Sequence, residues 1–506
     1  MAETKREVER KYESDDGGLP DLTGVAGVAD VLDKGVTELD ATYYDTADLR
    51  LAAASITLRR RTGGSDAGWH LKLPVAPGVR DEIRAPLSDT VPDEIAALVR
   101  SRVRTGQIVA VVRLRSRRDV RELLDHGGRP LAETSVDAVR AERLHGGEGT
   151  AEWTEIEVEL ADGGDPAFLD KVDKRLRKAG VRPSASPSKL ARALAETAPP
   201  KQRATAAGEP VPAGKPVTAG DHVLAYLRAQ RDAIVELDPA VRRDAEDSVH
   251  SMRVATRRLR STFKSFGKVL DRAVTDPVGD ELKWLAGELG RDRDREVLTE
   301  RLTTTLDGVP ADLVRGPVSE RITTWSRAEH DGARGRLLGV LDSRRYLDLL
   351  DTLDALIADP PLRKAAGRKP RKVLAKAVKK DFRKVAGLVQ QARELEPGTD
   401  RDVAIHNARK KTKRTRYAAE AGEPALGKPA KNLVKTMKGL QNLLGDHQDS
   451  VMARQTLREL SAVAHAAGQD TFTYGLLHER EEQRALRVEA ELPAFWDGIK
   501  DATAGL

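Results

Sequence analysis

Hydrophobic and polar residues alternate with two different periods along this chain of 506 residues. Up to about Ala198, short runs alternate with a period of two between Gly, Pro and Asp turns, which is typical of strands. Beyond about Gly220 the apolar positions recur with a helical period. The stretch between them is rich in Pro, Ala and Gly, as linkers are. We therefore predict a β-rich domain over residues 1–198, a linker over 199–218 and an all-α domain over 219–506.

Most of the predicted strands carry charges on the face opposite their apolar face. Side chains alternate across a strand, so one face of the sheet is ionic. The charged positions of successive runs are Glu7, Glu9 and Lys11; Arg59 and Arg61; His70 and Lys72; Arg80, Glu82 and Arg84; Arg113, Arg115 and Arg117; and Glu155, Glu157 and Glu159. An open antiparallel sheet would leave these charges in solvent. Because some runs are almost wholly acidic and others almost wholly basic, they favour a closed barrel with a charged interior.

The composition excludes several classes of site. The chain has no cysteine, which excludes disulfides, a thiolate nucleophile and cysteine-ligated metals. Aromatic residues make up 4%, so stacking of nucleobases is not expected. With 86 Lys and Arg against 80 Asp and Glu, any strong electric field must come from local clustering. The charged N-terminus lacks a secretion signal and no run approaches the roughly 18 apolar residues of a membrane span, so we expect a cytoplasmic protein without membrane contact.

The first and last acidic runs suggest a metal site. Glu7 and Glu9, two positions apart on a strand, project to one side about 6 to 7 Å from each other. They can share a hard divalent cation, and Lys11 can meet a phosphate that the metal also touches. Glu155, Glu157 and Glu159 add a second row of carboxylates, and cations for a phosphate chain come from Arg59, Arg61, Lys72, Arg115, Arg117 and Lys189. Such a cavity fits a metal-bound tripolyphosphate.

These residues resemble the signature of the CYTH, or triphosphate tunnel metalloenzyme, superfamily. Glu7, Glu9 and Lys11 are similar to its ExExK motif, and residues 3–197 also follow its order of segments: YYDTADLRLAAASITLRRR, WHLKLP, VRDEIR, EIEVEL and SKLARAL. The resemblance implies an antiparallel eight-stranded β-barrel tunnel in which acids bind Mg²⁺ or Mn²⁺ and basic residues bind triphosphate. The matching metal ligands are Glu7, Glu9, Glu155, Glu157 and Glu159, and the matching phosphate ligands are Lys11, Arg59, Arg61, Lys72, Arg115, Arg117 and Lys189. Arg84 departs from the family, where an acid is often found, and no general base is identified.

An internal repeat runs through the helical region. The segment HSMRVATRRLR, His250–Arg260, aligns with HNARKKTKRTR, His406–Arg416. Further on, LKWLAGELGRDRDREV from Leu282 aligns with MKGLQNLLGDHQDSVM from Met437. We therefore predict two related helical halves that form a bundle pair about a pseudo-twofold axis.

Both copies of the repeat place cations on one stripe of a helix. His250, Arg253, Arg257 and Arg260 follow i, i+3, i+7, i+10 spacing, as do His406, Arg409, Lys413 and Arg416. Neither eleven-residue segment contains an acid, and residues 363–384 hold eleven Lys or Arg against one acid. Because like charges at this spacing repel, the pattern favours a groove for an extended polyanion. A solvated face, a salt-bridged seam or core histidines are the alternatives.

The repeated motifs are similar to those of the CHAD domain, a conserved-histidine α-helical domain often found after CYTH, over about residues 219–500. The resemblance implies inorganic polyphosphate as the ligand. The residues assigned to it are those of both stripes together with Lys369, Arg371, Lys376 and His447. Asp292 aligns with His447, so the halves are not chemically identical, and no group of histidines and acids at metal spacing is visible.

The sequence therefore predicts a divalent-metal-dependent inorganic triphosphatase that hydrolyses tripolyphosphate or a related triphosphate and binds polyphosphate through its helical domain. The main alternative is a non-catalytic polyphosphate-binding protein. Binding of nucleic acid by the basic helices and purine nucleotide cyclisation are further alternatives, and the low aromatic content disfavours nucleobase recognition. The sequence leaves open the substrate's chain length, the preferred metal and the oligomeric state.

Overall fold

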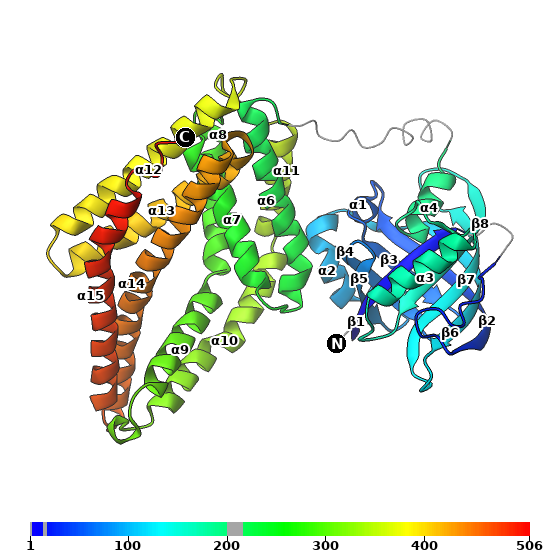
Figure 1. Ribbon diagram of the computed structural model, residues 1–506, viewed down its shortest axis with the longest axis horizontal. Coiled ribbons are helices and arrows are strands. Elements are labelled where there is room, and N and C mark those ends of the chain that lie inside the picture. The colour runs from blue at the N-terminus through cyan, green and yellow to red at the C-terminus, as the bar shows by residue number, and fades with distance from the viewer. Residues whose placement is uncertain (1–2, 14–17, 200–215) are drawn as a thin grey trace. The chain divides into compact units, whose positions relative to one another are not determined.

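The chain forms two compact units, Met1–Pro212 and Ala213–Leu506. Figure 1 presents the computed structural model, which describes residues 3–13, 18–199 and 216–506, leaving out the side chains of 291–294 and 328–331. Most of the predicted linker, residues 200–215, lies outside the described residues. No helix in the described part of the chain is both long enough and apolar enough to cross a membrane.

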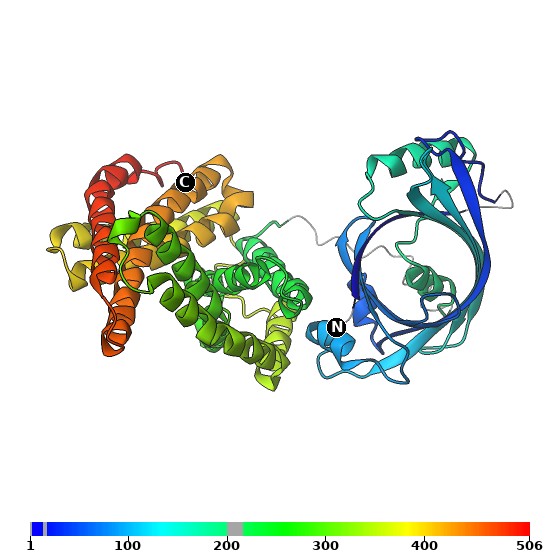
Figure 2. The ribbon, with the colours of Figure 1, turned by 90° about the horizontal axis from the view of Figure 1, so that it is seen from below.

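A closed antiparallel β-barrel of eight strands forms the N-terminal unit, as predicted. The strands are β1 (Glu3–Glu13), β2 (Asp30–Thr46), β3 (Thr57–Thr62), β4 (Gly68–Ala76), β5 (Val79–Ala85), β6 (Ile108–Leu124), β7 (Pro130–Arg143) and β8 (Thr150–Leu160). They pair in the order β5-β4-β3-β2-β6-β7-β8-β1, and β1 also pairs with β5. This last pairing closes the sheet, so that the barrel seen along its axis is a ring (Figure 2). The short β9 (Arg182–Pro183) pairs with β1, and α1 (Arg50–Ala53) connects β2 to β3.

Helices cover the apolar outer surface of the barrel and thereby fix which side chains point inward. Phe168 and Val172 of α3 (Ala167–Lys178) share a core with Ile156 and Val158 of β8. Ile95 and Val99 of α2 (Asp93–Val103) pack in the same way on the β3–β5 side. Because even-numbered residues of β8 face α3, its odd-numbered glutamates face the interior.

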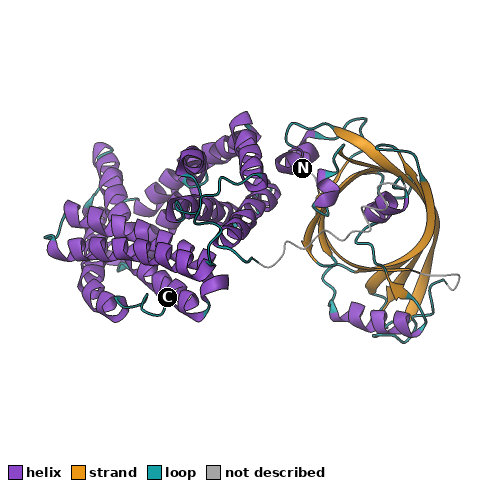
Figure 3. Ribbon diagram, turned by 90° about the horizontal axis from the view of Figure 1, so that it is seen from above, coloured by secondary structure: helices purple, strands orange, loops and turns teal. Residues whose placement is uncertain are grey.

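The helix α4 (Lys189–Glu196) lies within one end of the barrel (Figure 3). Ser188 caps it by accepting a hydrogen bond from the Ala191 amide at 3.1 Å. Leu190 and Ala193 pack in a cluster with barrel residues Ala41, Tyr43, Val111, Val112, Leu114, Val139, Ala141 and Trp153. The barrel is therefore filled by an apolar core at this end, and its polar interior begins at Lys189.

The second unit consists of helices. They are α6 (Ala219–Arg242), α7 (Ser248–Ser265), α8 (Arg272–Glu288), α9 (Arg291–Asp307), α10 (Val318–Asp342), α11 (Arg344–Ala358), α12 (Pro370–Glu394), α13 (Thr399–Leu426), α14 (Lys428–Ala466) and α15 (Phe472–Ile499), with a short 3₁₀ turn, Ala311–Leu313. The two copies of the repeat begin on α7 and α13, which pack against each other. One core includes Leu259 of α7 and Ala408 of α13, and a second joins α9 and α10 to α14 and α15. The halves therefore interlock and share their cores.

Candidate active site and polyanion surface

The interior of the barrel holds a cavity of about 780 Å³ lined by charges of both signs. The predicted residues that line it are Glu7, Glu9, Lys11, Arg59, Arg61, Lys72, Glu157, Glu159 and Lys189. Glu7 of β1 and Glu157 of β8 thus face one enclosed space, as strand alternation predicts. Lining residues that were not assigned a role from the sequence include Lys5, Tyr43, Arg80, Glu82, Arg84 and Arg118.

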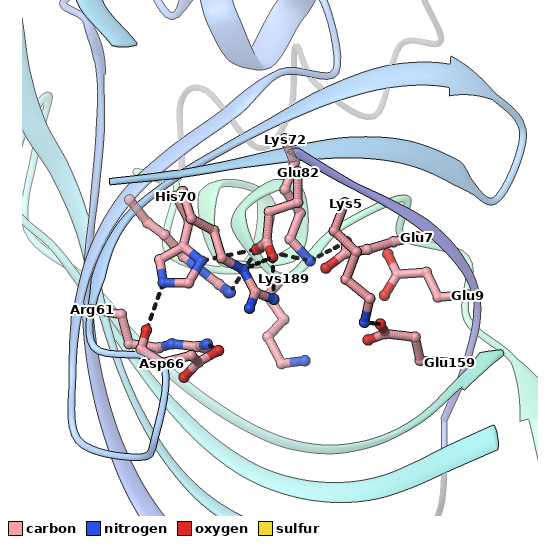
Figure 4. A network of polar contacts seen from close by, with 12 residues as sticks. Lys5, Glu7, Glu9, Arg61, Asp66, His70, Lys72, Glu82, Glu159 and Lys189 are labelled. Atoms are coloured by element: carbon pink, nitrogen blue, oxygen red, sulfur yellow. Dashed lines mark hydrogen bonds and ion pairs between the residues drawn. The ribbon is translucent and has the colours of Figure 1, made fainter. Parts of the chain in front are cut away.

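The carboxylates of β1 and β8 form an acidic wall in which each group meets a lysine. Glu7 accepts a hydrogen bond from Lys72 Nζ at 2.6 Å, and Glu159 accepts one from Lys5 Nζ at 2.7 Å. Glu9 lies directly across from Glu159 in the strand register and pairs with Lys11 at 3.1 Å. Figure 4 shows how Glu7, Glu9 and Glu159 converge on one side of the cavity. The wall therefore places several carboxylate oxygens around a single space.

These carboxylates suit a hard divalent cation. Burial raises the pKa of Glu7 above its ordinary value, although the charge of Lys72 opposes this shift. A raised pKa means that the positive charge nearby does not fully offset the cost of burying the ionised carboxylate. An added cation would therefore stabilise the ionised form. Carboxylate oxygens are also the donors that Mg²⁺ and Mn²⁺ prefer. Glu7, Glu9 and Glu159 therefore offer the type of donor that such an ion prefers.

A second acidic group surrounds Lys189, the first residue of α4. Ligand atoms of Asp137, Glu155 and Glu157 lie within 4.8 Å of one another. Lys189 Nζ reaches all three, at 2.9, 2.8 and 2.7 Å respectively. Glu155 also accepts a hydrogen bond from Trp153 Nε1 at 2.7 Å and does not line the cavity. The predicted metal ligand Glu155 therefore belongs to this second acidic group and not to the cavity lined by Glu7, Glu9 and Glu159, and Trp153 and the ammonium of Lys189 contact its carboxylate.

Glu82 on β5 is surrounded by basic side chains of the cavity. We call the basic side chains on this side of the cavity the basic wall. Its carboxylate lies 2.9 Å from His70 Nδ1, 3.6 Å from Arg59 and 3.7 Å from Lys72. Arg84, the departure from the family pattern, donates to it at 2.6 Å. Burial alone would raise the pKa of Glu82, but the bond with His70 and the charges of Lys72 and Arg59 hold it far below its ordinary value. The VRDEIR alternation contained the signal for Glu82, since it placed this residue on the ionic face.

The predicted inward face of β6 is wrong. Arg115 is 54% exposed and lies 3.6 Å from Asp40, and Arg117 is also exposed; neither lines the cavity. Arg118 points inward instead and reaches Asp137 and Glu157, each at 2.7 Å. The reason is α4, which requires apolar Val112 and Leu114 on the inner face where it enters the barrel. Strand alternation then sends the odd-numbered arginines outward.

The basic stripes of the repeat converge in the helical unit. Burial, together with the charges of Arg409, Arg257 and Arg253, lowers the pKa of Lys413 to about 7, and the charge of Asp449 opposes this shift. Cations of α13 and α7 therefore face one another.

Two glycines of the repeat lie beside equivalent arginines. A Cβ at Gly290 would lie 2.6 Å from Arg253 Nη2, and one at Gly445 would lie 3.5 Å from Arg409 Nε. Gly290 aligns with Gly445, and Arg253 aligns with Arg409, in the repeated sequence. The alignment therefore corresponds to a repeated packing arrangement.

Not every predicted cation belongs to this convergence. Arg416 lies 3.3 Å from Glu420 of its own helix, and His250 is exposed at the start of α7. Lys369, Arg371 and Lys376 are exposed at the start and along the outer face of α12. Within the described chain none of the eleven cations of residues 363–384 forms an ion pair. These residues form a separate basic surface, which we call the α12 face.

The predicted place of His447 on the polyanion surface is wrong. Its side chain is buried, and its Nε2 lies 3.3 Å from Asp402 and 3.2 Å from Glu489. Residues two apart on a helix point about 200° from each other, so His447 faces away from Gly445 and Asp449. Three helices thus assemble a histidine and two acids that the sequence does not place together. The side chain of the aligned Asp292 lies outside the described part.

Family models match both parts of the chain. A model described as the CYTH domain matches residues 5–194, and one described as the CHAD domain matches residues 225–458. An uncharacterized protein of Mycobacterium tuberculosis is 40% identical over 504 residues, which cover 96% of this chain and 95% of that protein.

More distant similarities concern single units. Human thiamine-triphosphatase is 44% identical over 79 residues, which cover 16% of this chain and 31% of that enzyme. The crystal structure of the CHAD domain from the plant Ricinus communis is 24% identical, with coverage of 57% of this chain and 93% of that one and a TM-score of 0.45.

Proposed function

Because this chain belongs to the proteins in which a CYTH domain precedes a CHAD domain, we propose that its tunnel hydrolyses inorganic tripolyphosphate or a related triphosphate with a divalent metal. We further propose that the helical unit binds inorganic polyphosphate. The observation that carries the first proposal is the enclosed cavity with an acidic wall opposite a basic one. The similarity to thiamine-triphosphatase supports the same reaction class.

The acidic wall provides the place for the metal. Glu7, Glu9 and Glu159 would hold Mg²⁺ or Mn²⁺, while cations of the chain already neutralise Glu157. The metal when bound would polarise the phosphoryl group and acidify a water molecule. Because Lys5, Lys11 and Lys72 touch these carboxylates, they can turn to phosphate oxygens when the metal neutralises the wall.

The basic wall would hold the phosphate chain and neutralise the charge that develops on the leaving phosphate. Arg59, Arg61 and Arg118 approach the cavity from β3 and β6. Guanidinium groups bind phosphate oxygens through two donors at once, which fixes orientation as well as charge. In phosphoryl transfer such positioning and charge stabilisation supply most of the catalysis.

The helical unit is suited to binding without chemistry. Arg253, Arg257, Arg409 and Lys413 concentrate positive charge, and the charges of the three arginines help to lower the pKa of Lys413. A polyphosphate chain would bring negative charge to this group. Such binding releases counterions and weakens steeply with salt, as is known for other linear polyanions.

The double substitution Glu7→Ala, Glu9→Ala tests the assignment of hydrolysis to the tunnel. We expect phosphate release from tripolyphosphate to fall at least about 100-fold, while polyphosphate binding is retained. Glu152→Ala, on the exposed outer side of β8, is the matched control. If the double variant keeps both phosphate release and polyphosphate binding, the assigned metal site is contradicted. If the wild-type protein binds polyphosphate but releases no phosphate from tripolyphosphate, ATP, thiamine triphosphate or polyphosphate with Mg²⁺ or Mn²⁺, the non-catalytic alternative holds.

A further inference from the structure

The loop between β3 and β4 inserts a carboxylate into the wall of the cavity. Gly64, Ser65 and Asp66 all line this space. The Asp66 carboxylate forms an ion pair with Arg61, and its main-chain oxygen lies 2.9 Å from His70 Nε2 (Figure 4). His70 is held in turn by Glu82. The loop is thus anchored through its main chain, while its carboxylate engages a cation that the proposed function assigns to substrate.

Arg61 lies in a strongly positive environment. Its side chain is 6% exposed, and burial with the charges of Arg59 and Arg118 lowers its pKa to about 9. Asp66 is the carboxylate that contacts its guanidinium within the described chain, since Glu82 acts on it without forming an ion pair. A phosphate group of a substrate would need this same guanidinium.

We propose that Asp66 competes with the substrate: its carboxylate occupies on Arg61 the position of a phosphate group and must leave before the phosphate chain is fully bound. This inference rests on the proposed function, because it requires that the cavity bind a phosphate chain. The Asp66 side chain is 30% exposed, so it can turn to solvent while its main-chain oxygen stays on His70. Asp66 thereby sets the affinity of the tunnel for every ligand that needs Arg61.

Binding of inorganic tripolyphosphate by calorimetry, without divalent metal, tests the inference separately from catalysis. Tripolyphosphate can bind fully only to those molecules in which Asp66 has left Arg61. Asp66→Asn is therefore expected to tighten the binding of tripolyphosphate about 3- to 30-fold. The matched control is Asp162→Asn, which removes another carboxylate that lines the cavity but pairs with no arginine in the described chain. It is expected to leave the affinity close to that of the wild type.

A double-mutant cycle shows whether the effect passes through Arg61. In an Arg61→Gln background, Asp66→Asn is expected to change the affinity little. Unchanged or weaker binding by the single variant, equal tightening by Asp162→Asn, or tightening that persists without Arg61 would each overturn the inference. The thermal shift caused by tripolyphosphate, larger for a folded Asp66→Asn variant than for wild type, provides a second readout. If wild-type protein binds no tripolyphosphate even when Mg²⁺ is added, the proposed function fails instead.

Discussion

At the scale of single residues, two arginines of the helical unit differ from Lys413 in forming ion pairs with acids of other helices. Arg258 meets Glu420 at 3.0 Å, and Arg414, its counterpart in the repeat, meets Asp381 at 3.1 Å. These two arginines tie helices together. Lys413 lies among other cations, so its charge costs stability in the free protein. A residue that is costly in the free protein and compensated by a ligand is typical of a binding site.

Lys413 should make the stability of the helical unit depend on pH. Its folded pKa of about 7 lies below the ordinary 10.5, so between these values the unfolded chain binds a proton that the folded chain lacks. The free energy of unfolding therefore rises with pH across this window, and the full penalty is present below about pH 7. We expect Lys413→Met to stabilise the protein by on the order of 2 kcal/mol at pH 6 and far less at pH 10.

Denaturant unfolding of this variant at both pH values measures the difference. Lys410→Met, at an exposed neighbouring position of α13, serves as the control for loss of a surface charge. Equal effects of Lys413→Met at pH 6 and pH 10 would contradict the assignment.

At the scale of secondary-structure elements, alternation along the strands predicts much of the cavity but fails where a helix enters the barrel. On β1 and β8 the charged face is the inner one, as expected, because α3 covers the apolar outer face of β8. On β6 the apolar residues Val112 and Leu114 face inward instead. The pattern of one strand does not reveal that α4 will pack inside. The position of His447 fails for a related reason, since its partners come from α13 and α15.

The register of β6 gives opposite outcomes for adjacent arginines. Arg118→Gln removes an inward guanidinium that contacts Asp137 and Glu157, and we expect KM for tripolyphosphate to rise at least about tenfold. Arg117→Gln, one residue earlier on the outer face, is expected to change KM by less than about twofold. Steady-state kinetics with thermal unfolding of each variant makes the comparison. Similar effects of both substitutions would indicate that the assigned inner face is incorrect.

The basic stripes of α7 and α13 should contribute to polyphosphate binding in a different way from the α12 face. We expect Arg253→Gln with Arg409→Gln to abolish binding of short and long chains, because these arginines lie where two basic helices meet. The triple substitution Lys369→Gln, Arg371→Gln, Lys376→Gln should weaken the binding of long chains. It should also make the slope of log affinity against log salt concentration shallower, by about 0.7 per lost contact if polyphosphate behaves as a single strand. Affinity measured against salt for both chain lengths tests this. If the salt dependence of the affinity is unchanged in the triple variant, the α12 face does not take part in polyphosphate binding.

At the scale of the whole molecule, two separately packed units divide the proposed tasks. Separate hydrophobic clusters support the barrel, and the helical unit has its own large core. Each unit can therefore respond to its own ligand.

Two thermal transitions with distinct ligand responses should follow. Tripolyphosphate with Mg²⁺ should raise one transition and long-chain polyphosphate mainly the other, each by several degrees at about 100 times the dissociation constant. The Arg253→Gln, Arg409→Gln variant should lose only the polyphosphate-dependent shift. A single transition that both ligands raise equally would contradict this division.

The helix inside the barrel has a consequence for how a long chain would be degraded. Since α4 fills one end, a linear polymer can enter the cavity only by its terminus and cannot be threaded through it. Cleavage would then shorten polymers progressively from their ends, never dividing them at internal bonds, and each released fragment would leave by the opening through which the next terminus must arrive.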